Sequence, residues 1–259
     1  MAETAEHQLE RFAHAQPEHS RSLRKAAYLT AGMGMAHALL FLLAFWLISD
    51  VPGPNASSQE ILDYYTSDQN RRPILVGLYV MPFAGIAFIW FIVALRMWIS
   101  GQIRRENVLL SNVQLVSGIL YIALFFGGAA ASSVMAASVQ FANGEVDPAT
   151  AREFPQLGSA LILVFGMRMA AMFVFSTTNI TRAVGIIPKW FAITGLVVGL
   201  GLLLSATFNQ GLVLVFPIWI LVFCTLLIRR AHRIPDDVMF DIEHGAIHPI
   251  APTGESNTA

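Results

Sequence analysis

The chain has 259 residues, of which 55% are hydrophobic and 13% charged, and its formal net charge is −1. An ordinary soluble domain carries about 25% charged residues, so this composition excludes that class and points to an integral membrane protein. The near-neutral balance also lacks the basic surface that duplex DNA requires, and no nucleic-acid partner is expected.

Apolar segments of membrane-spanning length recur along the chain. A hydrocarbon core of roughly 30 Å is crossed by about 20 helical residues. Six segments come close to this length or exceed it: 26–49, 74–98, 108–137, 157–180, 190–207 and 211–228. The sequence therefore predicts an all-α fold, a polytopic membrane helix bundle with six transmembrane helices over residues 26–228. The third segment exceeds the need and should tilt or extend into water.

Polar tails flank the predicted bundle at residues 1–25 and 229–259. Pro17 is expected to break the first tail, and both tails should be loosely ordered. The first apolar segment lacks a small-residue cleavage pattern behind it, so it should remain as a signal anchor.

Basic residues fix the predicted orientation, because Lys and Arg concentrate in cytoplasmic loops. Only Arg71, Arg72 and Arg152 fall on the predicted outer side. The inner side holds Arg11, Arg21, Arg24, Lys25, Arg96, Arg104, Arg105, Arg182, Lys189, Arg229, Arg230 and Arg233. We therefore expect a plasma-membrane protein with both termini cytoplasmic.

The two longer outer loops carry helix signals. In the first, residues 57–60 form a capping box, and a helix with an apolar face should follow. That face would consist of Ile61, Leu62 and Tyr65. In the second, Asp147 precedes a proline at the first helical position, and a short helix should end at Pro155.

Small residues at four-residue spacing predict close helix contacts. The pairs are Gly32 with Ala36, Gly128 with Ser132, Gly166 with Ala170 and Gly195 with Gly199.

Arg168 is the strongest functional pointer, because a cation at membrane depth is costly. It lies about 11 residues into the fourth segment, roughly 16 Å from the outer end, which a side chain can hardly span. All acidic residues lie in tails or loops, so partners must be neutral groups, water, a lipid headgroup, a loop acid that dips inward or an anionic ligand. The neutral candidates are His37, Gln114, Ser117, Tyr121, Ser132, Ser133 and Thr194.

Two interpretations of Arg168 stay open. A structural arginine would connect helices through carbonyls and hydroxyls. Alternatively, Arg168 would recognise a small anion or amphiphile in the bundle, assisted by His37, Gln114 and Tyr121, in a binding or transport protein. The binding interpretation predicts a cavity around Arg168 that opens to one side. The structural interpretation predicts that neutral groups accept the hydrogen bonds of Arg168.

The sequence gives less support to an enzymatic activity or to a bound cofactor. His37 is the only histidine within a predicted segment, which argues against a haem held by two histidines, and no cofactor or metal is expected. An outer-face lipid-modifying enzyme would need the loop acids Glu60, Asp63, Glu145 or Asp147. Nothing in the sequence pairs them, and two of them close together beside a cleft would favour this reading.

Several short sequence segments resemble those of a known family. They are the stretches 61–77 (ILDYYTSDQNRRPILVG), 91–96 (FIVALR), 187–190 (IPKW) and 216–219 (FPIW). Over residues 24–233 the pattern resembles uncharacterised six-helix integral membrane proteins of actinobacterial type, some grouped under domains of unknown function. The resemblance implies a bacterial plasma membrane and brings no activity or site residue with it.

The leading expectation is a membrane protein without enzymatic activity, an accessory or regulatory component. Its expected partners are the lipid bilayer together with other membrane proteins or further copies of this chain.

Overall fold

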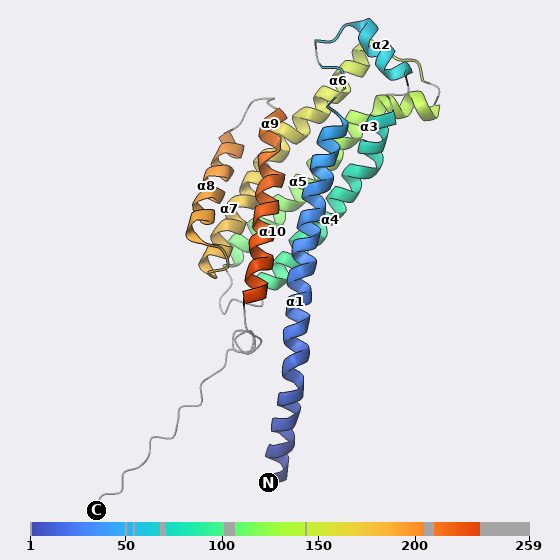
Figure 1. Ribbon diagram of the computed structural model, residues 1–259. Helices are drawn as coiled ribbons and strands as arrows, with labels where there is room; N and C mark the ends of the chain where they lie inside the picture. Colours follow the sequence, from blue (N-terminus) through green and yellow to red (C-terminus); the bar gives the residue numbers. More distant parts are fainter. Residues whose placement is uncertain are drawn as a thin grey trace, which may run out of the picture.

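The computed structural model describes residues 2–49, 51–53, 55–67, 71–100, 107–142, 144–204 and 210–233, with residues 2–23 described by backbone alone. All regular elements of these residues are helices (Figure 1). They are α1 (Ala2–Leu47), α2 (Ser58–Thr66), α3 (Arg71–Leu75), the π-helix η2 (Val76–Val80), α4 (Met81–Ser100), α5 (Val108–Ala142), α6 (Pro148–Ser159), the π-helix η3 (Ala160–Gly166), α7 (Met167–Ala183), α8 (Lys189–Leu204), α9 (Gln210–Val213) and α10 (Val215–Arg233).

Among the described residues, five helical stretches are long and apolar enough to cross a membrane. They are Arg24–Leu47, Arg71–Ile99, Val108–Ala142, Pro148–Ala183 and Gly211–His232. The prediction of a multi-pass helical membrane protein is confirmed at this level. The predicted segment 190–207 corresponds to α8, whose 16 residues fall short of that length. The expected tight link from Phe208 to Gln210 falls largely outside the described residues.

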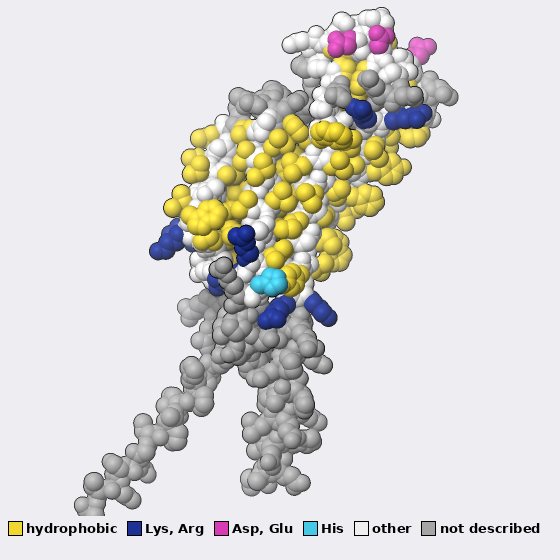
Figure 2. Space-filling model, viewed as in Figure 1, with side chains coloured by type: hydrophobic (Ala, Val, Ile, Leu, Met, Phe, Trp, Pro, Cys, Tyr) yellow, Lys and Arg dark blue, Asp and Glu magenta, His cyan; other side chains and the backbone are white. Residues whose placement is uncertain are grey.

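On the face in view, a broad band of apolar side chains covers the bundle, as in a protein that faces lipid (Figure 2). Trp46 is 70% exposed, Met97 71% and Phe83 60%. A water-soluble monomer rarely exposes a contiguous apolar surface of this extent. Lys and Arg side chains lie at both ends of the band in Figure 2, whereas the acidic side chains in view lie at the α2 end only.

The long helices pack side by side (Figure 1). Helix α1 packs between α4 and α10, α5 packs against α4 and α7, and α7 packs against α8. Gly185 has a φ of 69° and ends α7 in the left-handed conformation that glycine adopts freely, so that the chain turns toward α8.

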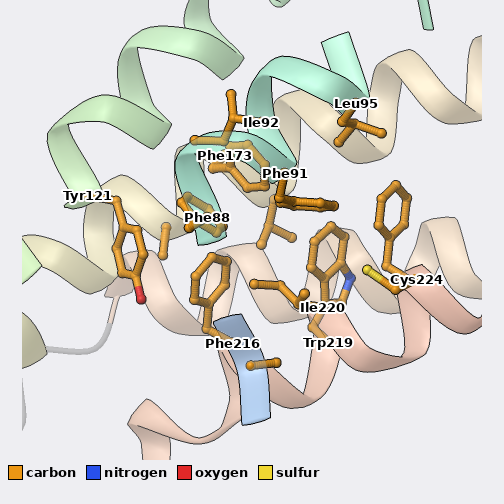
Figure 3. Packing of buried hydrophobic residues seen from close by; sticks show 14 of the residues in the cluster. Phe88, Phe91, Ile92, Leu95, Tyr121, Phe173, Phe216, Trp219, Ile220 and Cys224 are labelled. Atoms are coloured by element: carbon orange, nitrogen blue, oxygen red, sulfur yellow. The ribbon is translucent and has the colours of Figure 1, made fainter. Parts of the chain in front are cut away.

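A group of aromatic rings packs together within the main hydrophobic core (Figure 3). Phe88 lies at its centre, with ring centroids 5.1 Å from Tyr121, 5.2 Å from Phe173 and 5.9 Å from Phe216. These rings come from α4, α5, α7 and α10. One cluster therefore joins four spanning helices.

A second, smaller cluster joins α2 to the ends of α5 and α6, and we call this end of the molecule the cap. Its buried residues are Ile61, Tyr64, Tyr65, Ile74, Met135, Ala136 and Ala151. The 35 residues of α5 confirm that the third segment extends beyond the length a bilayer needs. Arg152 donates from Nη2 to the carbonyl of Ala56 at 2.8 Å and so ties α6 to the loop before α2.

Both predicted helix starts in the cap are confirmed. Ser57 Oγ accepts a hydrogen bond from the Glu60 amide, and the Asp147 carboxylate accepts from the amides of Ala149 and Thr150. The apolar face of α2 differs in one position, since Tyr64 is buried and Leu62 is half-buried.

Three expectations about helix continuity and contacts are wrong. Helix α1 continues through Pro17, and α6 continues through Pro155 into η3 and α7. A proline removes one backbone hydrogen bond, which neighbouring turns can offset, so a break is not obligatory. Gly32 faces open space rather than another helix, and Gly34, two residues along, makes the close contact with Phe91 and Cys224.

Candidate functional site

His37, on α1, is a fully buried polar residue inside the bundle. Its Nδ1 lies 2.9 Å from the carbonyl oxygen of Ala84, and its Nε2 lies 3.4 Å from the hydroxyl of Tyr121. A carbonyl can only accept, so Nδ1 carries the proton, and Nε2 of the neutral ring accepts from Tyr121. The imidazole therefore has a protein partner on each nitrogen.

Aromatic rings surround this imidazole. The ring of Phe88 lies 4.6 Å from it, that of Phe125 6.0 Å and that of Phe41 6.1 Å. Phe216 lies 6.4 Å away on α10. His37 is thus a hydrogen-bonded core residue that joins α1 to α4 and α5.

Gln114 lies elsewhere in the bundle and pairs with a residue that no sequence pattern indicated. Its Nε2 donates to Oγ1 of Thr177 at 2.7 Å, which links α5 to α7. Both side chains are buried. Thr177 belongs to a run of buried Ser and Thr on α7, and Ser176 and Thr181 of that run donate to carbonyls of their own helix.

Arg168 follows the π-helix η3 and is half-buried. Its Nη1 donates to the carbonyl of Val164 at 3.0 Å, one turn earlier on the same continuous helix. Val164 lies inside η3, whose wider turns are often found at functional positions. The guanidinium is therefore held toward the cap by a backbone contact within its own helix.

Arg168 is half-buried and lies at the edge of the outward face of its helix, where exposed and buried residues meet. Phe165, three residues earlier, is 54% exposed, and Met172, four residues later, is 37% exposed. Residues three and four apart share one face of a helix. Ala171, three residues after Arg168, is buried in the core, as are Met167 and Ala170, so the core begins directly beside Arg168.

The structure divides the four predicted ligand-binding residues into separate sets. His37 and Tyr121 form one hydrogen-bonded pair, and Gln114 bonds to Thr177. Arg168 bonds to its own backbone instead. The other neutral candidates also bond locally: Ser117 donates to the Gln114 carbonyl, Ser133 to that of Ala129 and Thr194 to that of Trp190, while Ser132 lies against Gly158.

Arg168 nevertheless lies at nearly the same depth as His37. A Cβ built on Gly166 would lie 4.0 Å from the ring of Tyr121, which pairs with His37. Arg168 is two residues further along, about 3 Å at the helical rise. Arg182 on the same helix lies 14 positions away, or roughly 21 Å. The cation therefore lies deep within the apolar band.

A cavity of about 510 Å³ opens in the cap. It is lined by Pro52, Ser57, Gln59, Glu60, Asp63, Tyr64 and Ser67. Two of the loop acids considered for an outer-face enzyme, Glu60 and Asp63, thus line one cleft. Both are exposed, and Asp63 accepts a hydrogen bond from Gln59 at 2.9 Å. Asp147 instead caps α6.

Comparisons with protein-family models, with curated proteins and with solved structures find no match. The six-helix actinobacterial resemblance therefore stays a prediction, and the functional argument depends on the geometry of this chain.

Proposed function

We propose that this protein is a non-enzymatic accessory component of a membrane assembly, which holds or regulates another membrane protein. In this proposal all six predicted segments span the plasma membrane of a bacterium, α8 included, with both termini cytoplasmic. The basic residues at the end of the bundle opposite the cap support that orientation.

The observation that carries the proposal is the filled interior around His37. A transport path needs polar groups that can exchange partners with a substrate. Here both nitrogens of His37 are bonded to protein groups, and the rings of Phe88, Phe125 and Phe216 pack around it. In this proposal the polar residue at mid-depth serves packing, while half-buried Arg168 lies beside exposed Phe165 and Met172, where a partner could reach it.

Site-specific photocrosslinking in native membranes tests this function. A photoreactive residue at Phe165 in η3 or at Met172 in α7, both on the outward face of this continuous helix, should give a protein adduct of one defined mass. The same residue at Leu39 or Val197, which are 58% and 65% exposed on α1 and α8, serves as the matched control. A reciprocal crosslink from the captured protein back to α7 establishes that the contact is specific.

Two results would contradict an accessory role. One is a set of adducts that contains lipid alone at every position tested. The other is anion uptake by proteoliposomes that depends on Arg168, which would favour the binding or transport alternative.

The cap cavity supports a second candidate, an outer-face lipid-modifying enzyme that uses Glu60 and Asp63. Hydrolytic chemistry at such a site employs paired carboxylates as acid and base. The test is turnover of labelled phospholipids by the wild-type protein in vesicles, compared with Glu60→Gln and Asp63→Asn. Turnover that both substitutions abolish would establish this function, and turnover that neither changes would refute it.

A further inference from the structure

Arg168 raises a question of charge balance that the proposed function leaves open. Insertion of an arginine at the centre of a transmembrane helix is energetically costly. The carbonyl of Val164 contributes one neutral acceptor. The guanidinium has five N–H donors, so most of its hydrogen-bonding capacity and all of its charge remain for another group.

The described residues supply no carboxylate at that depth. Its 17 acidic residues lie outside the six apolar segments, and residues 205–209, which follow α8, contain none. Glu153 is the acidic residue of the same helix, and it lies 15 positions away, roughly 22 Å at the helical rise.

Lipid headgroups are distant as well. On the cap side, Trp46 marks the interface as an exposed aromatic residue, nine positions beyond His37 on α1 and so about 14 Å along the axis. On the other side, the level of Arg182 is roughly 21 Å away. An arginine side chain reaches several ångströms, and this one is held by its own backbone.

A second copy of the chain does not neutralise the charge. Its outward face of α7 would bring another Arg168, flanked by Phe165 and Met172, which are apolar. Like charges in a low-dielectric medium repel.

We propose that the outward face of α7 is a docking surface for a transmembrane helix of a different protein, and that this helix carries an Asp or Glu at the depth of Arg168. A guanidinium can pair with a carboxylate through two parallel hydrogen bonds, which gives orientation as well as attraction. Exposed Phe165 and Met172 supply apolar contacts above and below the ion pair. This inference rests on the proposed accessory function and specifies the chemistry of the partner.

The experiment uses the full-length chain in phosphatidylcholine vesicles with a synthetic transmembrane helix of Leu and Ala as the probe. A set of probes places a single Glu at successive depths, and each has a Gln counterpart. Energy transfer between a label on the C-terminal tail and a label on the probe measures association. Intramembrane polar contacts contribute about 1–2 kcal/mol, so we expect the Glu probe of matching depth to bind roughly tenfold better than its Gln counterpart.

Substitutions at Arg168 and Arg182 show which arginine causes the preference for the Glu probe. Arg168→Gln should abolish the Glu preference, and Arg168→Lys should keep part of it, which also covers the case in which the Gln variant folds poorly. Arg182→Gln changes an exposed arginine at the other end of α7 and should keep the full preference.

Several results would overturn the inference. They are equal binding of Glu and Gln probes, a preference that does not vary with depth, or a preference that survives in Arg168→Gln. A lipid headgroup would be the ligand if two results came together. The preference for the Glu probe would disappear in phosphatidylglycerol vesicles, and this lipid would raise the melting temperature of the wild-type protein but not that of Arg168→Gln. Self-association that depends on Arg168 would assign the site to a second copy. A specific crosslinked partner with no Glu preference would leave the accessory function in place and remove only this inference.

Discussion

His37 and Arg168 lie at nearly the same depth, yet the protein accommodates them in opposite ways. His37 points into the bundle, where a carbonyl, a tyrosine hydroxyl and four phenylalanine rings surround it. Arg168 lies at the edge of the outward face and bonds to its own backbone. The comparison teaches that a polar residue in a membrane segment indicates function through its surroundings rather than through its depth. The satisfied residue packs within the fold, and the incompletely satisfied one is the residue for which we propose a partner.

The largest effect should follow from removal of the ring that supports His37. Phe88 is fully buried, and its ring lies 4.6 Å from that of His37. Phe88→Ala would leave a cavity at the junction of four helices and should lower the free energy of unfolding by about 3 kcal/mol. Thermal or denaturant unfolding in detergent micelles measures the loss. Phe83→Ala, at a position 60% exposed on the same helix, is the control and should change little.

The next effect concerns the contact of α1 with α4 and α10. A Cβ on Gly34 would lie 2.5 Å from Cys224 Sγ and 2.8 Å from Phe91 Cδ2. Gly34→Leu should therefore destabilise the bundle by roughly 2 kcal/mol through overpacking. Gly32→Leu has no atom within 4 Å of the new Cβ and should leave the melting temperature nearly unchanged. Equal melting temperatures for the two variants would show that α1 does not pack in this register.

A smaller effect should follow from loss of the Tyr121 hydroxyl. Tyr121→Phe keeps the ring and removes the donor to His37 Nε2, which leaves a buried acceptor without its partner. Hydrogen bonds within membrane bundles contribute about 0.6 kcal/mol on average, and a loss near 1 kcal/mol is expected here. Tyr79→Phe, 56% exposed, is the matched control. If both variants unfold alike, the contact between Tyr121 and His37 contributes nothing to stability.

Local signals explain what the sequence could predict. The caps at Ser57 and Asp147 need only residues within one turn, so their side chains and the adjoining helices could be assigned in advance. The apolar segments are equally local, because membrane thickness sets their length. Arg168 could also be identified from the sequence as a candidate functional residue, because a charged side chain within an apolar segment carries a free-energy cost.

Non-local geometry explains the rest. The seven residues of η3 turn the chain by a different angle per residue than an α-helix does, so the face on which Arg168 lies could not be counted from the start of the helix. The pairing of Gln114 with Thr177 joins residues on different helices and has no signal within either segment. The continuation of α6 through Pro155 depends on its packing against α5.

The smallest effect is a pH dependence confined to the cap. Hydrogen bonds from the Thr150 side chain, then from the amides of Thr150 and Ala149, lower the pKa of Asp147 below its usual 3.8. A carboxyl group whose pKa is lower in the folded state stabilises the fold at pH values above its unfolded-state pKa. That stabilisation disappears as the pH falls through the folded-state pKa. The start of α6 should therefore fray in acid, as the pH falls through the folded-state pKa of Asp147. Hydrogen exchange of residues 147–155 across the acid range measures this fraying. Asp147→Asn retains an N-cap acceptor but does not titrate, so its exchange protection should stay flat over the same range. A wild-type profile as flat as that of the variant would show that the cap does not depend on the charge of Asp147.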